Sequence, residues 1–327
     1  MRKKCYVIAD FLTDGNKKDI SDTAKATGFD VAFFEDAAEA DGKGSDAEVL
    51  FSGEDANIIK QMPELKWCHT AFAGIGAYAQ SGVFDSGDVI LTNSSGAYGR
   101  TISEHIIMVT LMLMKNMTSY NKVMAAHEWV HDYPVRSIAD SNIVIIGTGD
   151  IGSNTALKFK ALGAKKVIGF NRSGAKPEEF DVVYRLSEFD NLFKDKKFAD
   201  SVDVLVLCVP GTSESKGLLS RERIAMLPEK TYIINVGRGI TIDQDSLIEA
   251  LNSGKIAGAA LDVVYPEPLP PEHPLWTAKN TIITPHISGD MGLQYTIDKT
   301  IEFFCENLKR YSNGERLINI ADIKKGY

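Results

Sequence analysis

The sequence predicts an α/β protein of two domains, each built on a doubly wound parallel sheet, with a cleft between the domains. Three observations lead to this expectation. The chain has 327 residues, which is more than one hydrophobic core usually serves. Short apolar runs typical of strands alternate with polar or helical stretches along most of the chain. One long helical segment interrupts this rhythm, which then begins again, so we expect a domain boundary there.

The first hundred residues contain the strands expected for the first domain. The β-like runs are CYVIADF at 5–11, VAFFED at 31–36, EVLFSG at 48–53, LKWCHTAF at 65–72 and VILTN at 89–93. Their alternation with helical stretches is typical of a parallel sheet with crossover connections. The segment 101–126 then shows apolar periodicity without Gly or Pro, so we expect one long helix between the domains.

From Asn142 onward the apolar runs become nearly continuous, which is typical of strands covered on both faces. These runs are NIVIIG at 142–147, KKVIGF at 165–170, VDVLVLCV at 202–209, TYIINVG at 231–237, IAGAALDVV at 256–264 and NTIITPH at 280–286. A helix-like stretch follows at 294–311, and we expect the end of the chain to return to the first domain. The predicted domains are therefore residues 1–99 together with 289–327, and residues 100–288.

The charge of the chain argues against a nucleic-acid partner. The formal net charge is −8 and the sequence pI is near 5.4, whereas binding to phosphates requires clustered Lys and Arg. The longest apolar run, 106–114, is about half of the roughly 18 residues that span a bilayer, so we expect no membrane partner. Asp10 interrupts the apolar start of the chain, which therefore predicts a first strand and a cytoplasmic protein. The four cysteines form no CxxC pair and predict no metal site.

A glycine-rich turn connects the strand at 142–147 to a helix-forming stretch, and another strand follows. Gly147 would permit the tight turn, Gly149 would admit a pyrophosphate against the backbone, and Gly152 would let helix and strand pack closely. Phosphates would then lie at a helix N-terminus, where free N–H groups favour anions. The alternative is a purely structural turn. We expect a Rossmann-like dinucleotide-binding domain in 100–288, leaving 1–99 with 289–327 as the substrate domain. The predicted cofactor contacts here are Gly147, Gly149, Asp150, Ile151 and Gly152.

Three polar residues follow predicted strands of the second domain. Arg238 and Glu267 come after the runs that end at 237 and 264, and His286 closes the run at 280–286. Because the carboxyl ends of parallel strands meet at one edge of the sheet, these side chains can converge although they are far apart in the sequence.

Together these three residues suit the reduction of a 2-oxo acid. A guanidinium binds a carboxylate with two hydrogen bonds and polarises the neighbouring carbonyl, which is the role predicted for Arg238. His286 would give a proton to the forming alkoxide, and Glu267 would orient its imidazole and favour the charged form. Taken singly, each residue also has an ordinary interpretation, as a surface ion pair, a solvated carboxylate or a turn residue.

The sequence resembles the D-isomer-specific 2-hydroxyacid dehydrogenase family, which includes phosphoglycerate, glyoxylate/hydroxypyruvate and D-lactate enzymes. The blocks that carry the resemblance are LKWCHTAFAGIGAY, NSSGAYGRTISEH, IIGTGDIG, LCVPGTSESKGLL, INVGRG, AALDVVYPEPLP and TPHISG, in the family's order. The resemblance implies that Arg238 binds substrate, that His286 is the acid/base and that Glu267 is its partner. It further implies a homodimer and substrate contacts from the backbone of Ala73 and Gly74.

The same resemblance implies contacts to the cofactor outside the glycine turn. Thr101 and Asp262 would approach the nicotinamide, and Val209 and Pro210 would flank the adenine side. The sequence also departs from the family pattern, because Gly76 stands where many members have Asp, which leaves the identity of the substrate open.

Tyr98 and Arg100 precede the predicted interdomain helix. They could touch a distal group of the substrate, and the alternatives are capping and surface roles.

The residues after KKVIGF bear on the choice of cofactor. NAD enzymes usually carry Asp or Glu about 20 residues after the glycine turn to bind the ribose hydroxyls, but Asn171, Arg172 and Ser173 stand here. Arg172 and Ser173 offer a charge and hydrogen-bond donors for a 2′-phosphate, so NADPH is the predicted cofactor, with NAD possible. Alternatively, Arg172 lies over the adenine ring or in solvent, and Asn171 tolerates NAD.

The predicted function is therefore an oxidoreductase that transfers a hydride between NAD(P)H and a small 2-oxo acid or D-2-hydroxy acid. A nicotinamide-sensing binding protein, such as the corepressors that share this fold, is the alternative. Formate dehydrogenase is disfavoured, because Glu267 and His286 are both present.

Overall fold

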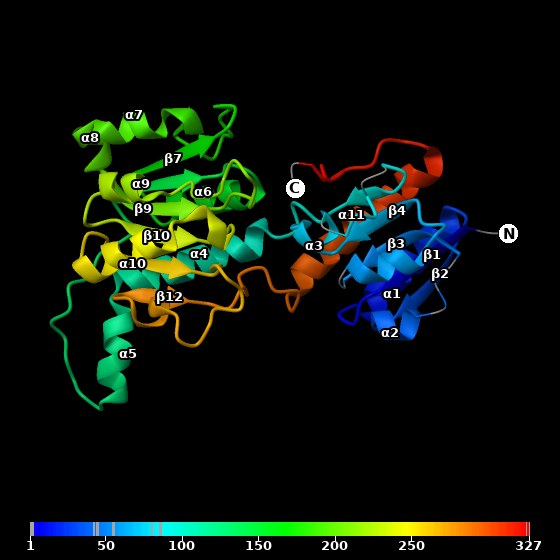
Figure 1. Ribbon diagram of the computed structural model, residues 1–327, viewed down its shortest axis with the longest axis horizontal. Helices are drawn as coiled ribbons and strands as arrows, with labels where there is room; N and C mark the ends of the chain where they lie inside the picture. Colours follow the sequence, from blue (N-terminus) through cyan, green and yellow to red (C-terminus); the bar gives the residue numbers. More distant parts are fainter. Residues whose placement is uncertain are drawn as a thin grey trace. The chain divides into compact units, whose positions relative to one another are not determined.

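The computed structural model describes residues 3–41, 43, 46–53, 56–79, 81–84, 87–324 and 326 (Figure 1). The chain forms two compact units. The first combines Met1–Tyr98 with Met291–Tyr327, and the second is Gly99–Asp290. Within the described residues, none of the helices combines the length and apolar character that a membrane span requires.

A five-stranded parallel sheet forms the centre of the first unit, with the order β2-β1-β3-β4-β5. The strands are β1 Lys3–Ile8, β2 Phe29–Phe34, β3 Ala47–Ser52, β4 Trp67–Thr70 and β5 Ile90–Thr92. The helices are α1 Asp14–Ala26, α2 Ala37–Ala40, the 3₁₀ helix η1 Ala56–Gln61, α3 Gly76–Ala79 and α11 Gln294–Asn313. This strand order is one of the two common doubly wound arrangements.

Alternate residues of β1 enter the two cores of this unit, as the two-residue period of a strand requires. Cys5 and Val7 pack with residues of α1 and α11, whereas Tyr6 and Ile8 pack with residues of α2, η1 and α3. Helices therefore cover both faces of the sheet.

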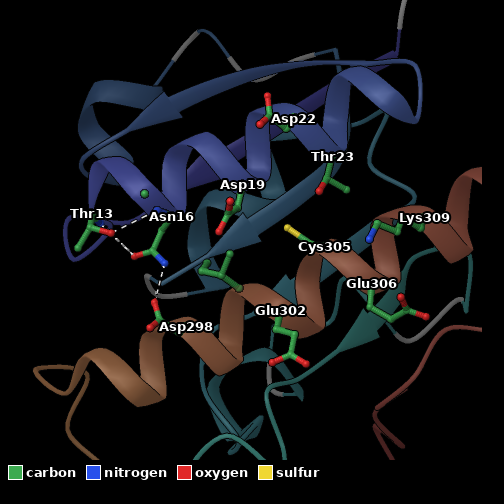
Figure 2. Close-up of a pocket in the computed structure, with 12 residues that line it drawn as sticks. Thr13, Asn16, Asp19, Asp22, Thr23, Asp298, Glu302, Cys305, Glu306 and Lys309 are labelled. Carbon is green, nitrogen blue, oxygen red and sulfur yellow. Dashed lines mark hydrogen bonds between the residues drawn. The ribbon is translucent and has the colours of Figure 1, made fainter.

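The N-terminal ends of α1 and α11 are connected by side-chain hydrogen bonds (Figure 2). Thr13 and Asn16 form a capping box at the start of α1, and Asn16 Nδ2 also donates to Asp298 of α11 at 2.9 Å. The cap satisfies N–H groups that a helix start leaves unpaired. The hydrogen bond from Asn16 to Asp298 connects the C-terminal helix α11 to α1 within the first unit.

The second unit contains a seven-stranded parallel sheet with the order β12-β11-β10-β9-β6-β7-β8. The strands are β6 Asn142–Ile146, β7 Lys166–Asn171, β8 Val182–Arg185, β9 Val202–Leu207, β10 Tyr232–Asn235, β11 Gly258–Leu261 and β12 Thr281–Ile283. The α-helices are α4 Gly99–Met114, α5 Met117–Ala125, α6 Asp150–Ala161, α7 Phe189–Lys194, α8 Lys196–Ala199, α9 Arg221–Met226 and α10 Gln244–Ser253, and the 3₁₀ helices are η2 Leu186–Glu188, η3 Gly239–Thr241 and η4 Pro274–Thr277. The prediction of two doubly wound parallel sheets is confirmed.

The prediction of one helix over 101–126 is wrong. The helix breaks between α4 and α5 at Asn116, whose φ of 55° is left-handed. Asn adopts this conformation more easily than most residues, and a right-handed helix cannot pass through it. The side chain of Asn116 donates to the carbonyl of Pro134, which holds the break in place.

In the second unit, β6 pairs with β7 on one side and β9 on the other, so the chain reverses its winding direction there. Ligands of doubly wound sheets bind at such a switch point, outside the carboxyl ends of the strands. The glycine turn follows β6 at this position.

Candidate active site

The glycine turn leaves no room for side chains at two positions. Gly147 has φ of +102°, and a Cβ there would lie 2.7 Å from the carbonyl oxygen of Cys208. A Cβ on Gly152 would lie 2.0 Å from the carbonyl oxygen of Gly147. Gly149 precedes α6 without a side-chain cap, and a Cβ there would meet nothing within 4 Å. The turn therefore offers open space beside the uncapped N-terminus of a helix, which fits a pyrophosphate.

Asp150 has a structural contact that sequence reasoning did not foresee. Its carboxylate accepts the N–H of Gly99 at the start of α4, and a Cβ on Gly99 would lie 2.3 Å from Asp150 Oδ1. Burial raises the pKa of Asp150, and the hydrogen bond from Gly99 opposes this shift. A carboxylate at a helix N-terminus is stabilised by the free N–H groups there. Asp150 therefore joins the first turns of α4 and α6, and Ile151 follows it in α6.

His286 and Glu267 lie together after β12 and β11. His286 Nδ1 is 2.9 Å from Glu267 Oε2, and Glu267 Oε1 accepts the N–H of Val264 at 3.0 Å. Because an ionised carboxylate only accepts hydrogen bonds, Nδ1 of His286 carries the proton in this pair. Within the described part of the chain, Nε2 of His286 has no hydrogen-bond partner. This nitrogen is therefore available to a substrate.

Arg238 follows β10 and precedes η3. Its Nη1 donates to the carbonyl of Gly237 at 2.7 Å, and its stem passes Gly211, where a Cβ would lie 2.9 Å from Arg238 Cγ. Burial lowers the pKa of Arg238, and the charge of Glu267 opposes this shift. Glu267 is therefore near both the imidazole and the guanidinium.

Asp262 organises the loop that carries His286. Its carbonyl accepts the N–H of His286, whose φ of 56° is left-handed. The Asp262 carboxylate accepts from Thr284 Oγ1 at 2.6 Å and from the N–H groups of Ile287 and Ser288 at 2.9 and 3.0 Å. Burial raises the pKa of Asp262, but hydrogen bonds from Ser288 and Thr284 bring it below its ordinary value. Its approach to the nicotinamide stays a prediction.

His105 of α4 is a neighbour of this carboxylate that sequence reasoning missed. Its Nε2 lies 3.3 Å from Thr284 Oγ1 and 3.9 Å from Asp262 Oδ1. Burial lowers the pKa of His105, so the neutral imidazole is favoured. Its only sequence signal was its place in the helix that also holds Thr101, which is buried.

The turn after β7 is shaped by Asn171. Its Nδ2 donates to Thr148 Oγ1 at 2.7 Å and to Ala175 O at 2.8 Å, and its Oδ1 accepts the N–H of Gly174. Ser173 Oγ donates to Asn171 Oδ1 at 3.3 Å. Asn171 therefore joins this turn to the glycine turn.

Arg172 is exposed and forms an ion pair that the sequence did not reveal. Its Nη1 is 3.7 Å from Glu214 Oε2, in the loop that follows β9. Val209 and Pro210 lie near the start of this loop, and Pro210 O accepts from Ser215 Oγ at 2.6 Å. A carboxylate is therefore present beside Arg172, although none follows β7 in the sequence.

The substrate loop predicted in the first unit follows β4. Ala73 and Gly74 are both half-buried there. Tyr98, for which a substrate contact was one interpretation, is buried, and its hydroxyl donates to Ala71 O at 2.7 Å. The Tyr98 hydroxyl therefore serves the loop itself.

Two of the hollows in the described structure bear on the site. One of about 520 Å³ lies beside Glu267 and His286 in the second unit, with an apolar lining that includes Val264, Leu269 and Trp276. The other, of about 860 Å³, lies between α1 and α11 of the first unit and is lined by carboxylates such as Asp19 and Glu302 (Figure 2). It contains no predicted site residue, and its negative charge is unsuited to an anionic substrate.

Comparison with known proteins identifies the family. The sequence profile of the D-isomer specific 2-hydroxyacid dehydrogenase, NAD binding domain, matches residues 107–288, which is more than half of the chain. The chain belongs to the D-isomer specific 2-hydroxyacid dehydrogenase family. It is accordingly an NAD(P)-dependent oxidoreductase of the 2-hydroxyacid dehydrogenase type. The comparisons give no support to the corepressor-like alternative.

Relatives of this dehydrogenase are similar over most of their length. An uncharacterized protein in the proB 3′ region of Corynebacterium melassecola is 30% identical over 292 residues, covering 86% of this chain and 90% of its own. A protein of Serratia proteamaculans named glyoxylate/hydroxypyruvate reductase A is 29% identical over 277 residues, covering 83% and 84%.

Solved structures of family members share the fold. A family protein from Aeromonas salmonicida subsp. salmonicida superposes with a TM-score of 0.85 and 27% identity, over 99% of this chain and 100% of its own. A dehydrogenase from Xanthobacter autotrophicus Py2, solved with NADPH and MES, gives a TM-score of 0.81 and 25% identity over 100% of both chains.

Proposed function

We propose that this dehydrogenase reduces small 2-oxo acids to D-2-hydroxy acids, as glyoxylate/hydroxypyruvate reductases or phosphoglycerate dehydrogenases do. The observation that carries the proposal is the contact of 2.9 Å between His286 Nδ1 and Glu267 Oε2, which leaves Nε2 available. The name of the Serratia proteamaculans relative supports the same substrate class.

Each residue has a role that follows from its chemistry. The guanidinium of Arg238 binds the substrate carboxylate and polarises the 2-oxo group. Nε2 of His286 donates a proton to the alkoxide oxygen, and Glu267 stabilises the imidazolium ion before and during this transfer. The N–H groups of Ala73 and Gly74 bind the same carboxylate. Reduced nicotinamide, when bound, supplies the hydride.

Apart from Thr101 of α4, the cofactor contacts follow the carboxyl ends of the strands in the second unit. The turn of Gly147, Gly149 and Gly152 holds the pyrophosphate at the start of α6. Thr101 and Asp262 approach the nicotinamide, and Val209 and Pro210 flank the adenine.

NADPH is the preferred cofactor in this proposal, and NADH is accepted less well. Arg172 and Ser173 lie at the end of β7, where a 2′-phosphate would bind, and the Xanthobacter autotrophicus relative was solved with NADPH. The test compares kcat/KM for NADPH and NADH in the wild type and in Asn171→Asp/Arg172→Ala. We expect the preference to shift toward NADH in the double variant. A wild type that prefers NADH, or a double variant without a shift, would refute this selection.

We further propose that the enzyme acts as a homodimer in the cytoplasm. The segment 117–135 exposes large apolar residues, including Trp129, which is 96% exposed. A second copy of the chain would remove them from water. The four cysteines are free thiols, as is usual in a reducing compartment. Light scattering should give a dimer mass that falls to the monomer mass in Trp129→Asp.

The substrate class is tested with a panel of glyoxylate, hydroxypyruvate, pyruvate and bulkier 2-oxo acids, each with both reduced cofactors. We expect turnover of at least one small 2-oxo acid. Tight binding of the dinucleotide without turnover of any panel member would contradict the proposed function.

A further inference from the structure

The loop that follows β4 is held by its carbonyl oxygens. Four consecutive carbonyls, those of residues 70–73, accept hydrogen bonds from residues 93–98. Ser94 Oγ donates to Thr70 O at 3.0 Å, and Tyr98 Oη donates to Ala71 O at 2.7 Å. The N–H of Ser94 donates to Phe72 O at 3.1 Å, and Asn93 Nδ2 donates to Ala73 O at 2.9 Å. The segment after β5 therefore clamps the whole loop.

Two N–H groups of the same loop are left for another acceptor. The N–H groups of Ala71 and Phe72 donate to Ser52 O and Thr70 Oγ1. Across the described residues, no acceptor is present for the N–H groups of Ala73 and Gly74. Successive free backbone N–H groups form a site for an anion.

Planarity of the peptide group connects the two observations. In a trans peptide the C=O of one residue and the N–H of the next lie in one plane and point in opposite directions. The bond from Ser94 to Phe72 O therefore fixes the direction of the Ala73 N–H. The bond from Asn93 to Ala73 O fixes the direction of the Gly74 N–H in the same way.

A buried series of hydrogen bonds holds Ser94 in place. Thr92 Oγ1 accepts from Trp67 Nε1 at 2.8 Å, so its hydroxyl proton is free to go to Nδ1 of His69, also at 2.8 Å. Nε2–H of His69 then donates to Ser94 Oγ at 3.1 Å, and Ser94 donates to Thr70 O. Burial lowers the pKa of His69 to about 3, so the ring is neutral, as this series of hydrogen bonds requires.

We propose that Asn93, Ser94 and Tyr98 are positioning residues for the substrate carboxylate. They hold the peptide groups of the loop so that N–H groups, and no carbonyl oxygen, meet the anion. A carbonyl turned toward the carboxylate would repel it, so the clamp selects an acid over its neutral amide. The inference rests on the proposed function, in which Ala73 and Gly74 bind that carboxylate.

The experiment measures three variants with the best 2-oxo acid of the panel and with its amide. Asn93→Ala frees the peptide group that carries the Gly74 N–H and also removes the acceptor of the Ser95 N–H. Tyr98→Phe removes the hydroxyl that donates to Ala71 O and contacts Met291 Sδ. Ser95→Ala is the matched control, because Ser95 lies in the same turn, is exposed, and its hydroxyl forms no hydrogen bond within the described chain. NADPH affinity is measured separately by fluorescence titration.

We expect Asn93→Ala to raise KM for the acid about tenfold, the effect of one lost hydrogen bond to a charged group, with kcat changed less than about threefold. The preference for acid over amide should fall by the same factor, while NADPH affinity stays at the wild-type value. Tyr98→Phe should show a smaller change of the same kind, and Ser95→Ala none.

Three outcomes would overturn the proposal. The first is an unchanged KM for the acid in Asn93→Ala. The second is an unchanged preference for acid over amide in this variant. The third is an equal decrease of kcat, NADPH affinity and thermal stability in this variant. A wild type that reduces no 2-oxo acid would instead show that the proposed function itself has failed, before any variant is compared.

Discussion

Two histidines in different regions of this molecule show how surroundings decide what an imidazole can do. His69 lies in the core of the first unit, and both ring nitrogens are bonded to the hydroxyls of Thr92 and Ser94. His286 follows β12, its side chain is 47% exposed, and its Nδ1 contacts the carboxylate of Glu267. Burial with hydroxyls as hydrogen-bond partners favours the neutral ring of His69, whereas the Glu267 carboxylate orients the ring of His286 and leaves its Nε2 available. His69 is therefore suited to holding a backbone in place, and His286 to moving a proton.

The largest effect should come from removing the imidazole that is suited to proton transfer. His286→Ala should lower kcat/KM for 2-oxo acid reduction by roughly 10² to 10⁴, the usual contribution of a positioned acid. NADPH affinity should not change, because the glycine turn is untouched. Steady-state kinetics and fluorescence titration measure the two quantities, with His131→Ala at an exposed position as the control. Normal turnover in His286→Ala would show that His286 is not the proton donor and that the contrast with His69 does not hold.

A second variant tests whether Asp262 holds His286 in its left-handed conformation. Asp262→Asn replaces one carboxylate oxygen by an NH2 group, so either the N–H of Ile287, which donates to Oδ1, or the N–H of Ser288, which donates to Oδ2, loses its acceptor. We expect kcat to fall roughly 10- to 100-fold, with a loss of about 1–3 kcal/mol in the free energy of unfolding. The measurements are steady-state kinetics and urea unfolding. A variant with wild-type kcat would show that the loop does not depend on this carboxylate.

The neutral state of His69 predicts acid sensitivity. Its pKa is about 3 in the folded chain and near 6.5 when unfolded, so protons bind the unfolded state more strongly below pH 6.5. Its contribution to stability is complete above about pH 6.5 and is lost as the pH falls toward 3. About 2 kcal/mol should disappear between about pH 6.5 and pH 5. Urea unfolding at several pH values should show a shallower dependence in His69→Gln, and identical slopes would contradict the assignment.

The smallest effect should come from the exposed ion pair between Arg172 and Glu214. Removing the carboxylate in Glu214→Gln should raise kcat/KM for NADPH roughly two- to fivefold, because a like charge next to the 2′-phosphate is lost. The gain should shrink at high salt, which screens exposed charges. Glu229→Gln is the control, because this exposed carboxylate precedes β10 and therefore lies at the amino ends of the strands, away from Arg172. An equal gain for NADH would show that Glu214 does not sense the 2′-phosphate.

The sequence by itself determined the parallel sheets and the positions of Arg238, Glu267 and His286 after their strands. A buried strand appears in the sequence as a short run of apolar residues, so the strands can be predicted from local sequence alone. β8 was not predicted because it is short and only partly buried. The break at Asn116 was not predicted because one left-handed residue does not change the apolar periodicity of the segment.

Only the tertiary structure decided which distant groups meet. Glu214 beside Arg172, His105 beside Asp262, and Asn93 on the carbonyl of Ala73 all join segments that the sequence separates. Such contacts depend on the order in which the strands pair in the whole sheet, and a local pattern of residues does not predict that order. The same holds for the two histidines, because hydroxyls or a carboxylate reach each imidazole only after the strands have paired.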